Sequence, residues 1–272
     1  MKDAASNVGP ARRKAYLPTV KIGGVEVARL SRRTWAKRIV LDCQEARSAA
    51  RIPPFYSSAN GNVLSHYAKS GEFRAAFDQA QGIDADGMPI VLASRWLTGH
   101  PVPERCATTD FFHDMADAAC HYGLSMYFLG GTEETNRKAV VASSDLHPGL
   151  RIAGRHHGYF SQEDEPAIVE QIVAAAPDVL WIGLGVPREQ SFVARNIAKL
   201  TTVGVVKTCG GLFDFIAGRP RAPKWMQDAS LEWLYRTVQE PGRLAGRYAS
   251  TNFHAVWLIL TRSGGRSAES MR

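Results

Sequence analysis

Residues 125–133, SMYFLGGTE, decide the fold that the sequence predicts. The apolar run that ends at Leu129 predicts a buried strand, and Gly130 and Gly131 predict a tight turn into a helix that begins near Thr132. Glycines at such a turn let backbone N–H groups approach a phosphate, and the N-terminus of a helix favours an anion. The pattern is not the G-x-G-x-x-G fingerprint of a dinucleotide site, so a simple turn between strand and helix is the alternative interpretation.

The same alternation of strand and helix continues along the chain from this stretch. Strands are predicted at 125–129, 150–153, 178–184 and 203–208, and helices at 132–141, 166–176 and 187–200. Apolar runs bounded by Gly or Pro and separated by helices of about 10–15 residues favour a parallel sheet with helices on both faces. The sequence therefore predicts an α/β fold.

Elements of a different kind are predicted at the two ends of the chain. Residues 1–20 are basic and expected to be disordered, and residues 20–27, VKIGGVEV, predict a small hairpin. Near the other end, Pro241 is expected to separate two helices. The second helix carries one apolar face, formed by Phe253, Val256, Trp257 and Leu260. That face is expected either to pack on the core or to lie at the headgroup level of a membrane.

Charge and cysteine usage narrow the class of protein. The net charge of +7 divides into +8 over residues 1–40, −5 over 41–240 and +4 over 241–272. An acidic middle with basic ends argues against a nucleic-acid groove through the core and suits docking of the ends onto an anionic surface. The four cysteines lack any paired or zinc-type spacing and indicate reduced thiols in a cytosolic protein. The sequence predicts neither a signal peptide in the first ten residues nor a membrane-spanning segment.

Residues 82–88, GIDADGM, form the stretch with the clearest potential for chemistry. A carboxylate beside a glycine can approach a substrate closely, so Asp86 is a candidate general base for a sugar hydroxyl. An Asp-Gly turn without chemistry is the alternative. Asp84 and Asp86 also have the Asp-x-Asp form that many glycosyltransferases use to hold a nucleotide diphosphate through Mg²⁺ or Mn²⁺.

A second glycine turn stands at residues 183–187, GLGVP, with Glu189 and Gln190 directly after it. Pro187 suits the first turn of a helix. Ligands of open α/β sheets bind at the carboxyl ends of the strands, which makes Gly185 and its neighbours candidates for substrate binding.

Taken together, these stretches resemble the WecG/TagA/CpsF family of bacterial glycosyltransferases over about residues 58–248. The residues that carry the resemblance are, in chain order, SAN at 58–60, DGM at 86–88, ER at 104–105, TD at 109–110, FLGG at 128–131, GYF at 158–160, PD at 177–178, GLGVP at 183–187, GGLFDF at 210–215, RAP at 221–223, LEWLYR at 231–236 and EP at 240–241.

The resemblance implies an inverting glycosyltransferase on a Rossmann-like fold, with a small N-terminal hairpin and a C-terminal helical appendage that approaches the membrane. A hexose-type sugar would pass from a UDP donor to a polyprenyl-diphosphate-linked acceptor at the cytoplasmic face of the bacterial membrane. The polymer would be an exopolysaccharide, a capsule or a cell-wall polymer. No obligatory metal is implied, although Asp84 and Asp86 leave Mg²⁺ or Mn²⁺ open. The expected parts are a disordered terminus at 1–20, the transferase domain at 21–235 and the appendage at 236–272.

The resemblance makes Asp86 the base that deprotonates the acceptor hydroxyl. The substrate-binding residues expected with it are Ser58, Asn60, Arg105, Thr109, Asp110, Gly130, Gly131, Gly185, Glu189, Gln190, Arg236, Arg243 and Arg247. The last three are appendage arginines that would steady the leaving UDP diphosphate, since arginine stays charged and binds phosphate with two N–H groups.

The chain departs from the family pattern at Asp84, a second acid that the catalytic carboxylate does not need, and in two short motifs. The family's Gly-Thr-Asp is Thr108-Thr109-Asp110, and its Pro-Lys-Gln-Glu is Pro187-Arg188-Glu189-Gln190 with the last two residues transposed. The transposition leaves open which of the two does the work of the family's glutamine. A non-catalytic membrane scaffold and a nucleotide-dependent oxidoreductase remain as alternative functions, and the donor sugar, the acceptor and a homo-oligomeric state are open.

Overall fold

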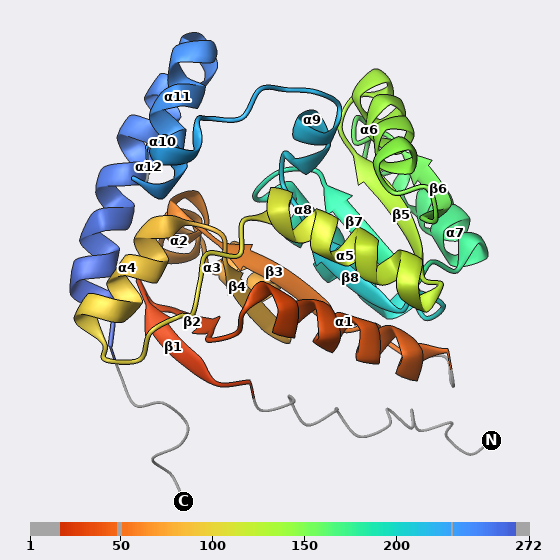
Figure 1. Cartoon of the computed structure of the whole chain (residues 1–272), viewed down its shortest axis with the longest axis horizontal. Helices are drawn as coiled ribbons and strands as arrows, with labels where there is room; N and C mark the ends of the chain where they lie inside the picture. The colour runs from red at the N-terminus through yellow and green to blue at the C-terminus, as the bar shows by residue number, and fades with distance from the viewer. Residues whose placement is uncertain (1–16, 48–50, 230, 265–272) are drawn as a thin grey trace, which may run out of the picture.

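The computed structural model describes residues 17–47, 51–229 and 231–264. Its centre is a six-stranded sheet in the order β4-β3-β8-β7-β5-β6 (Figure 1). The strands are β3 (Phe55–Ala59), β4 (Gly82–Ala85), β5 (Ser125–Gly130), β6 (Arg151–His156), β7 (Val179–Gly183) and β8 (Val205–Thr208). Every neighbouring pair runs parallel, which confirms the predicted α/β class.

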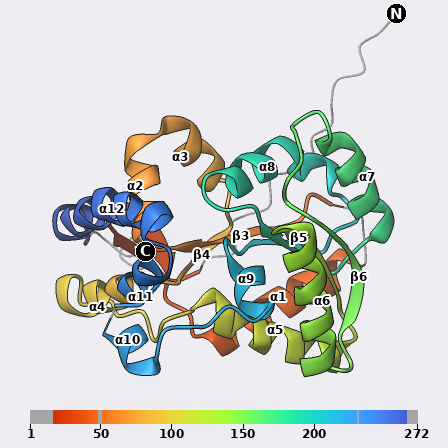
Figure 2. The ribbon, with the colours of Figure 1, turned by 90° about the horizontal axis from the view of Figure 1, so that it is seen from above.

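Helices cover both faces of this sheet (Figure 2). One face is covered by α2 (Gly61–Lys69), α3 (Gly71–Phe77), α7 (Glu165–Ala175) and α8 (Arg188–Asn196), and the other by α1 (Arg32–Ala46), α5 (Thr108–Tyr122), α6 (Glu133–Leu146) and α9 (Leu212–Ile216). Within β5, Tyr127 and Leu129 pack in the first layer, whereas Met126 and Phe128 pack in the second. Burial on both faces explains why this strand is a continuous apolar run and not an alternating one.

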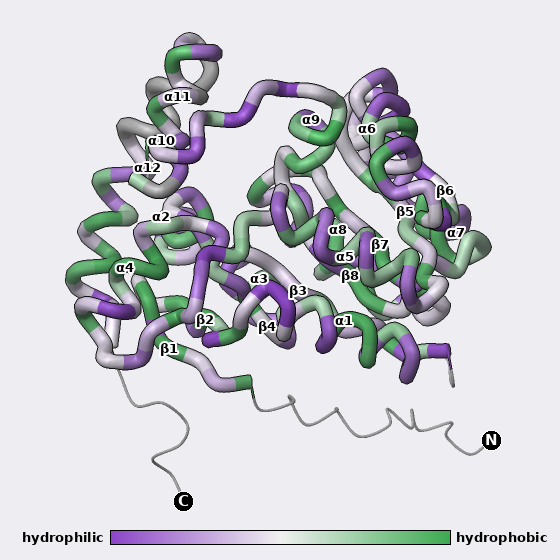
Figure 3. The backbone as a smooth tube through the Cα atoms, in the orientation of Figure 1, coloured by the Kyte–Doolittle hydropathy of each residue, from purple (hydrophilic) through white to green (hydrophobic). Residues whose placement is uncertain are grey.

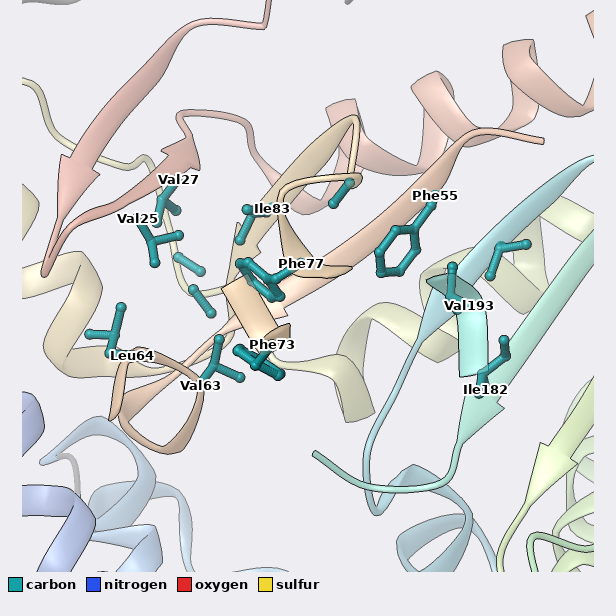
Figure 4. Close-up of a cluster of buried hydrophobic side chains, with 14 of the residues drawn as sticks. Val25, Val27, Phe55, Val63, Leu64, Phe73, Phe77, Ile83, Ile182 and Val193 are labelled. Carbon is teal, nitrogen blue, oxygen red and sulfur yellow. The ribbon is translucent and has the colours of Figure 1, made fainter. Parts of the chain in front are cut away.

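The first of these layers extends beyond the sheet to the N-terminal hairpin. Strands β1 (Thr19–Ile22) and β2 (Val25–Ala28) pair antiparallel through a turn at Gly23 and Gly24, both with positive φ. Val25 and Val27 face the side chains of α2 and α3, among them Leu64 and Phe77 (Figure 4). The predicted hairpin is therefore confirmed, with β1 beginning at Thr19; residues 1–16 lie outside the described residues.

The C-terminal part of the chain is helical, as predicted. It comprises α10 (Lys224–Asp228), α11 (Glu232–Gln239) and α12 (Pro241–Arg262), with Pro241 beginning the last helix. Helix α12 packs against α2 and against α4 (Met88–Leu97), and hydrophobic and hydrophilic residues alternate along it (Figure 3). Its end is tied to the hairpin, because Gly24 N donates to Arg262 O at 2.9 Å and Gly264 N donates to Lys21 O at 3.0 Å.

Two stretches before and within the candidate site have local features of their own. Helices α2 and α3 are separated at Ser70, whose Oγ accepts from Phe73 N at 3.1 Å and so caps the start of α3. Residues 82–85, expected as part of a turn, form the buried edge strand β4, and the apolar run after them is helix α4. The glycine and the aspartate among its residues disguise a strand that is only four residues long.

At the centre of the sheet, two neighbouring strands lead into helices on opposite faces. Strands β3 and β8 are neighbours, yet the chain leaves β3 into α2 on one face and leaves β8 into α9 on the other. Such a point opens a crevice at the carboxyl ends of the strands, where α/β proteins bind their ligands. A ligand site is therefore expected at the residues that follow β3, β4 and β8.

Candidate active site

Asp86 lies at the carboxyl end of β4 and is held at both oxygens. Its Oδ1 accepts from Thr108 N at 3.1 Å, and its Oδ2 accepts from Asn60 Nδ2 at 3.1 Å. The side chain is half-buried. A carboxylate has about four acceptor positions, so these two bonds orient the group and leave capacity for the proton of a substrate hydroxyl. Two of the predicted site residues, Asp86 and Asn60, are thus in direct contact.

Asn60 performs a second task at the same place. Its Oδ1 accepts from Val63 N at 3.2 Å and caps the N-terminus of α2. Its amide group is therefore fixed by the helix, and the Nδ2 that faces Asp86 does not rotate freely. This geometry explains why an asparagine suits this position, since its amide group has both an acceptor oxygen and a donor nitrogen.

Arg105 connects the Asp86 segment to the C-terminal helices. Its Nε donates to the backbone oxygen of Asp86 at 2.8 Å, and one of its terminal nitrogens donates to Glu232 Oε2 at 2.7 Å. Its side chain is 17% exposed. Sequence reasoning placed Arg105 in the substrate site; the structure shows two protein partners that make it a link between β4 and α11.

Asp110 and Thr109 lie in the first turn of α5, beside the donor to Asp86. Asp110 accepts from Arg221 at 2.7 Å and lies 3.5 Å from Arg32, so its carboxylate joins three segments of the chain. Thr108 stands where the family has glycine, but its backbone is helical, a conformation that any residue adopts. The departure at residue 108 therefore requires no unusual backbone.

The two glycine turns pack against each other. Gly130 has a φ of +142°, and a Cβ placed on it would lie 2.2 Å from the backbone oxygen of Gly183. Neighbouring strand ends can approach this closely only without side chains. Gly131 N donates to Gly183 O at 3.4 Å, and Gly185, with a φ of +78°, has open space around it. Gly130 thus has a structural role in addition to the predicted approach to phosphate.

Glu189 and Gln190 lie in the first turn of α8, and both are buried. Glu189 Oε2 accepts from Gly210 N at 2.9 Å, and Gln190 Nε2 donates to Glu189 Oε1 at 3.2 Å and to Ser57 Oγ at 3.4 Å. Burial raises the pKa of Glu189 to about 7, against the opposing effect of these hydrogen bonds. Near neutral pH this carboxyl group is therefore shared between its acid and carboxylate forms.

Comparison with known proteins identifies the group to which this chain is related. The model of the glycosyl transferase WecG/TagA/CpsF family matches residues 20–269. The chain belongs to this family. A relative from Bacillus subtilis (strain 168), named N-acetylglucosaminyldiphosphoundecaprenol N-acetyl-beta-D-mannosaminyltransferase, is 29% identical over 194 residues, which cover 71% of this chain and 74% of the relative. A protein of the same name from Staphylococcus aureus (strain MW2) is 26% identical over 196 residues, covering 72% and 76% of the two chains.

The arginines that the WecG/TagA/CpsF pattern assigns to the appendage lie on its last two helices. Arg236 lies on α11, and Arg243 and Arg247 lie on α12. Their side chains lie outside the described residues, so their assignment to the UDP diphosphate stays a prediction.

Sequence reasoning missed Lys207 in β8. This side chain is 1% exposed, and its Nζ lies 2.8 Å from Asp84 Oδ2 and 2.7 Å from Ser58 Oγ. Ser58, assigned from the sequence to the pocket, is thus bonded to a buried cation. The available signal was a lysine within the apolar run 203–208, since a charge in a central strand needs a partner.

The Asp-x-Asp stretch fits a divalent cation poorly in this arrangement. Asp84 is 2% exposed and already paired with Lys207, whereas Asp86 is oriented by Asn60 and Thr108. Across the described residues, no group of three or more His, Cys, Asp or Glu side chains is arranged to hold a metal ion. One of the two carboxylates that would bind the metal ion, Asp84, is therefore already neutralised by Lys207.

Proposed function

We propose that this protein is an inverting glycosyltransferase that moves a sugar from a UDP donor to a polyprenyl-diphosphate-linked sugar acceptor. The observation that carries the proposal is the Asp86 carboxylate, oriented by Asn60 and the first amide of α5 at the carboxyl edge of the sheet. The names of the relatives, which denote transfer of N-acetylmannosamine to a diphosphoundecaprenol-linked sugar, support the acceptor class. N-acetylmannosamine, glucose and a uronic acid are the donor sugars under consideration.

The proposed reaction is a single displacement. The acceptor hydroxyl gives its proton to Asp86 while its oxygen forms a bond to the anomeric carbon. The bond between that carbon and the diphosphate oxygen breaks on the opposite side, and UDP leaves with the electron pair. Positioning supplies much of the rate in such a reaction. Arginines of the appendage and oriented backbone amides are proposed to stabilise the charge that develops on the diphosphate.

We propose that the reaction needs no bound metal ion, because Lys207 already neutralises Asp84. The test is UDP release over a panel of UDP-sugars with a short-chain lipid-linked acceptor, with and without EDTA. The expected result is release that requires the acceptor, prefers one donor and is unchanged by EDTA. Loss of activity in EDTA, restored by Mg²⁺ or Mn²⁺, would contradict the metal-free mechanism. Absence of UDP release with every donor would favour the scaffold alternative.

We also propose that α12 lies against the inner face of the bacterial membrane. Phe253 is 81% exposed and Trp257 51% exposed, and Val256 and Leu260 lie exposed on the same side. Ala255, Leu258 and Ile259 on the other side are buried against the domain. Sequence reasoning left core packing and interfacial contact open for the first face, and its exposure supports the second. No helix in the described ranges is long and apolar enough to span a bilayer.

The proposed membrane face predicts a loss of vesicle binding on substitution. The triple variant Phe253→Ser, Trp257→Ser and Leu260→Ser should bind anionic phospholipid vesicles more than about tenfold more weakly, since full burial of each such side chain is worth about 1.5–3 kcal/mol. The melting temperature should hardly change, because these side chains are exposed. A matched control replaces the exposed Val141 and Leu146 of α6 with serine. Equal vesicle binding by the triple variant and the wild type would contradict the proposed face.

A further inference from the structure

Lys207 crosses the centre of the sheet beneath the candidate site. It lies on β8, and its ammonium group bonds to Ser58 on the neighbouring β3 and to Asp84 on β4, one strand further. A third contact joins Nζ to the backbone oxygen of Thr208 at 3.3 Å. Three adjacent strands are therefore held by one cation at their carboxyl ends.

The chemistry of an ammonium group defines what Lys207 does there. It carries three hydrogens and no acceptor position, and the protein supplies three acceptors. The pKa of Lys207 is raised, because the attraction of Asp84 outweighs the effect of burial, so the group stays charged. Since the side chain is 1% exposed and its hydrogens are all used, Lys207 does not itself contact the substrate.

The donor character of Lys207 fixes the direction of the next hydrogen bond. Ser58 accepts from Nζ, so its single hydrogen points away from Lys207. Asp84 is one acceptor for this hydrogen, since a side-chain hydrogen bond from Ser58 opposes the rise in the pKa of Asp84 that burial causes. A substrate oxygen beside Asp86 would be a second acceptor. Ser58 is only half-buried, and its Oγ lies 3.5 Å from Thr108 Oγ1. The backbone N of Thr108 is in turn the donor to Asp86 Oδ1. A short series of contacts thus runs from the buried cation to the proposed base.

We propose that Lys207 is a positioning residue for sugar transfer, which orients the Ser58 hydroxyl as a hydrogen-bond donor to a substrate oxygen beside Asp86. The inference rests on the proposed function and adds a residue to its site. Lys207 also neutralises Asp84, so of the two aspartates in this stretch Asp86 is the one available to the substrate. A purely structural ion pair is the competing explanation, and it predicts no link between Lys207 and the action of Ser58.

The experiment separates these explanations with four variants of the full chain. Lys207→Met alone leaves Asp84 as a buried unpaired charge and is expected to lower the melting temperature. The double variant Asp84→Asn/Lys207→Met removes both charges and is expected to recover most of that loss. Ser58→Ala, alone and combined with the double variant, removes the proposed donor. Melting temperature, kcat and KM for donor and acceptor are measured for each.

The double variant is expected to keep its fold. Its kcat is expected to fall about tenfold to a hundredfold, slightly less than the loss that follows when an oriented hydrogen-bond donor is removed outright. Adding Ser58→Ala to it should lower kcat no further, because both changes act on the same hydrogen bond. A double variant with wild-type kcat, or a Ser58→Ala effect that multiplies with that of the double variant, would overturn the proposal. Failure of the wild type to release UDP would instead reject the proposed function, which keeps the two failures apart.

Discussion

Replacement of Asp86 by asparagine is expected to lower transfer about 10²- to 10⁴-fold, the range that a positioned general base contributes. The amide keeps the size of the side chain, and its oxygen can still accept one of the bonds from Asn60 and Thr108. It cannot take the proton of the acceptor hydroxyl. Measurement of kcat at saturating donor and acceptor checks the prediction, with donor affinity from calorimetry expected to change little.

A matched control for the Asp86 variant is Asp145→Asn, which makes the same chemical change on an exposed carboxylate of α6. That variant should keep wild-type turnover and wild-type melting temperature. Near-normal turnover of Asp86→Asn would remove the carboxylate from the mechanism. A large fall in its melting temperature would instead show that the hydrogen bonds to Asn60 and Thr108 serve the fold first.

Gly130→Ala is expected to produce the largest loss of stability. The new Cβ would lie 2.2 Å from the backbone oxygen of Gly183, and the φ of +142° is unfavourable for any residue with a side chain. Backbone cannot move aside as a flexible side chain does, so the free energy of unfolding should fall by about 4–5 kcal/mol or more, the size of the severest single substitutions. Soluble yield and thermal unfolding measure the effect.

Gly123→Ala separates the collision at Gly130 from the conformational preference alone. Gly123 ends α5 with a φ of +62°, and a Cβ there would meet no atom within 4 Å. Its cost should be about 1–2 kcal/mol, that of a left-handed conformation for an ordinary residue. Similar losses of stability in the two variants would show that the strand ends at Gly130 and Gly183 separate easily.

The alternation of strands and helices could be predicted from the sequence because it depends on local patterns of residues. Strands β5 and β7 are each a short apolar run that ends at a glycine, and such a pattern needs only a few neighbouring residues to be recognised. The hairpin follows in the same way from its Gly-Gly turn. Strand β4 escaped prediction because its four residues include a glycine and an aspartate. Its burial is decided by the pairing with β3.

The residues of the candidate site also differ in whether a local pattern could reveal them. Asp86 and Asn60 were found because each stands in a recognisable short motif beside a strand end. Lys207 and the link from Arg105 to Glu232 were missed, since each joins residues that are far apart in the chain. No local pattern states that β8 lies next to β3, and only that order brings the lysine within reach of Asp84.

The sequence by itself determined the fold class, the family and the carboxylate on which the chemistry is proposed to depend, because periodicity and short motifs are properties of neighbouring residues. The tertiary structure decided which charges are neutralised and which apolar face is left exposed. The face of α12 that carries Phe253 and Trp257 is as apolar in the sequence as the face that carries Leu258, and only packing against α2 and α4 distinguishes them. Pairing and burial depend on distances in space, and the strand order of the sheet sets those distances.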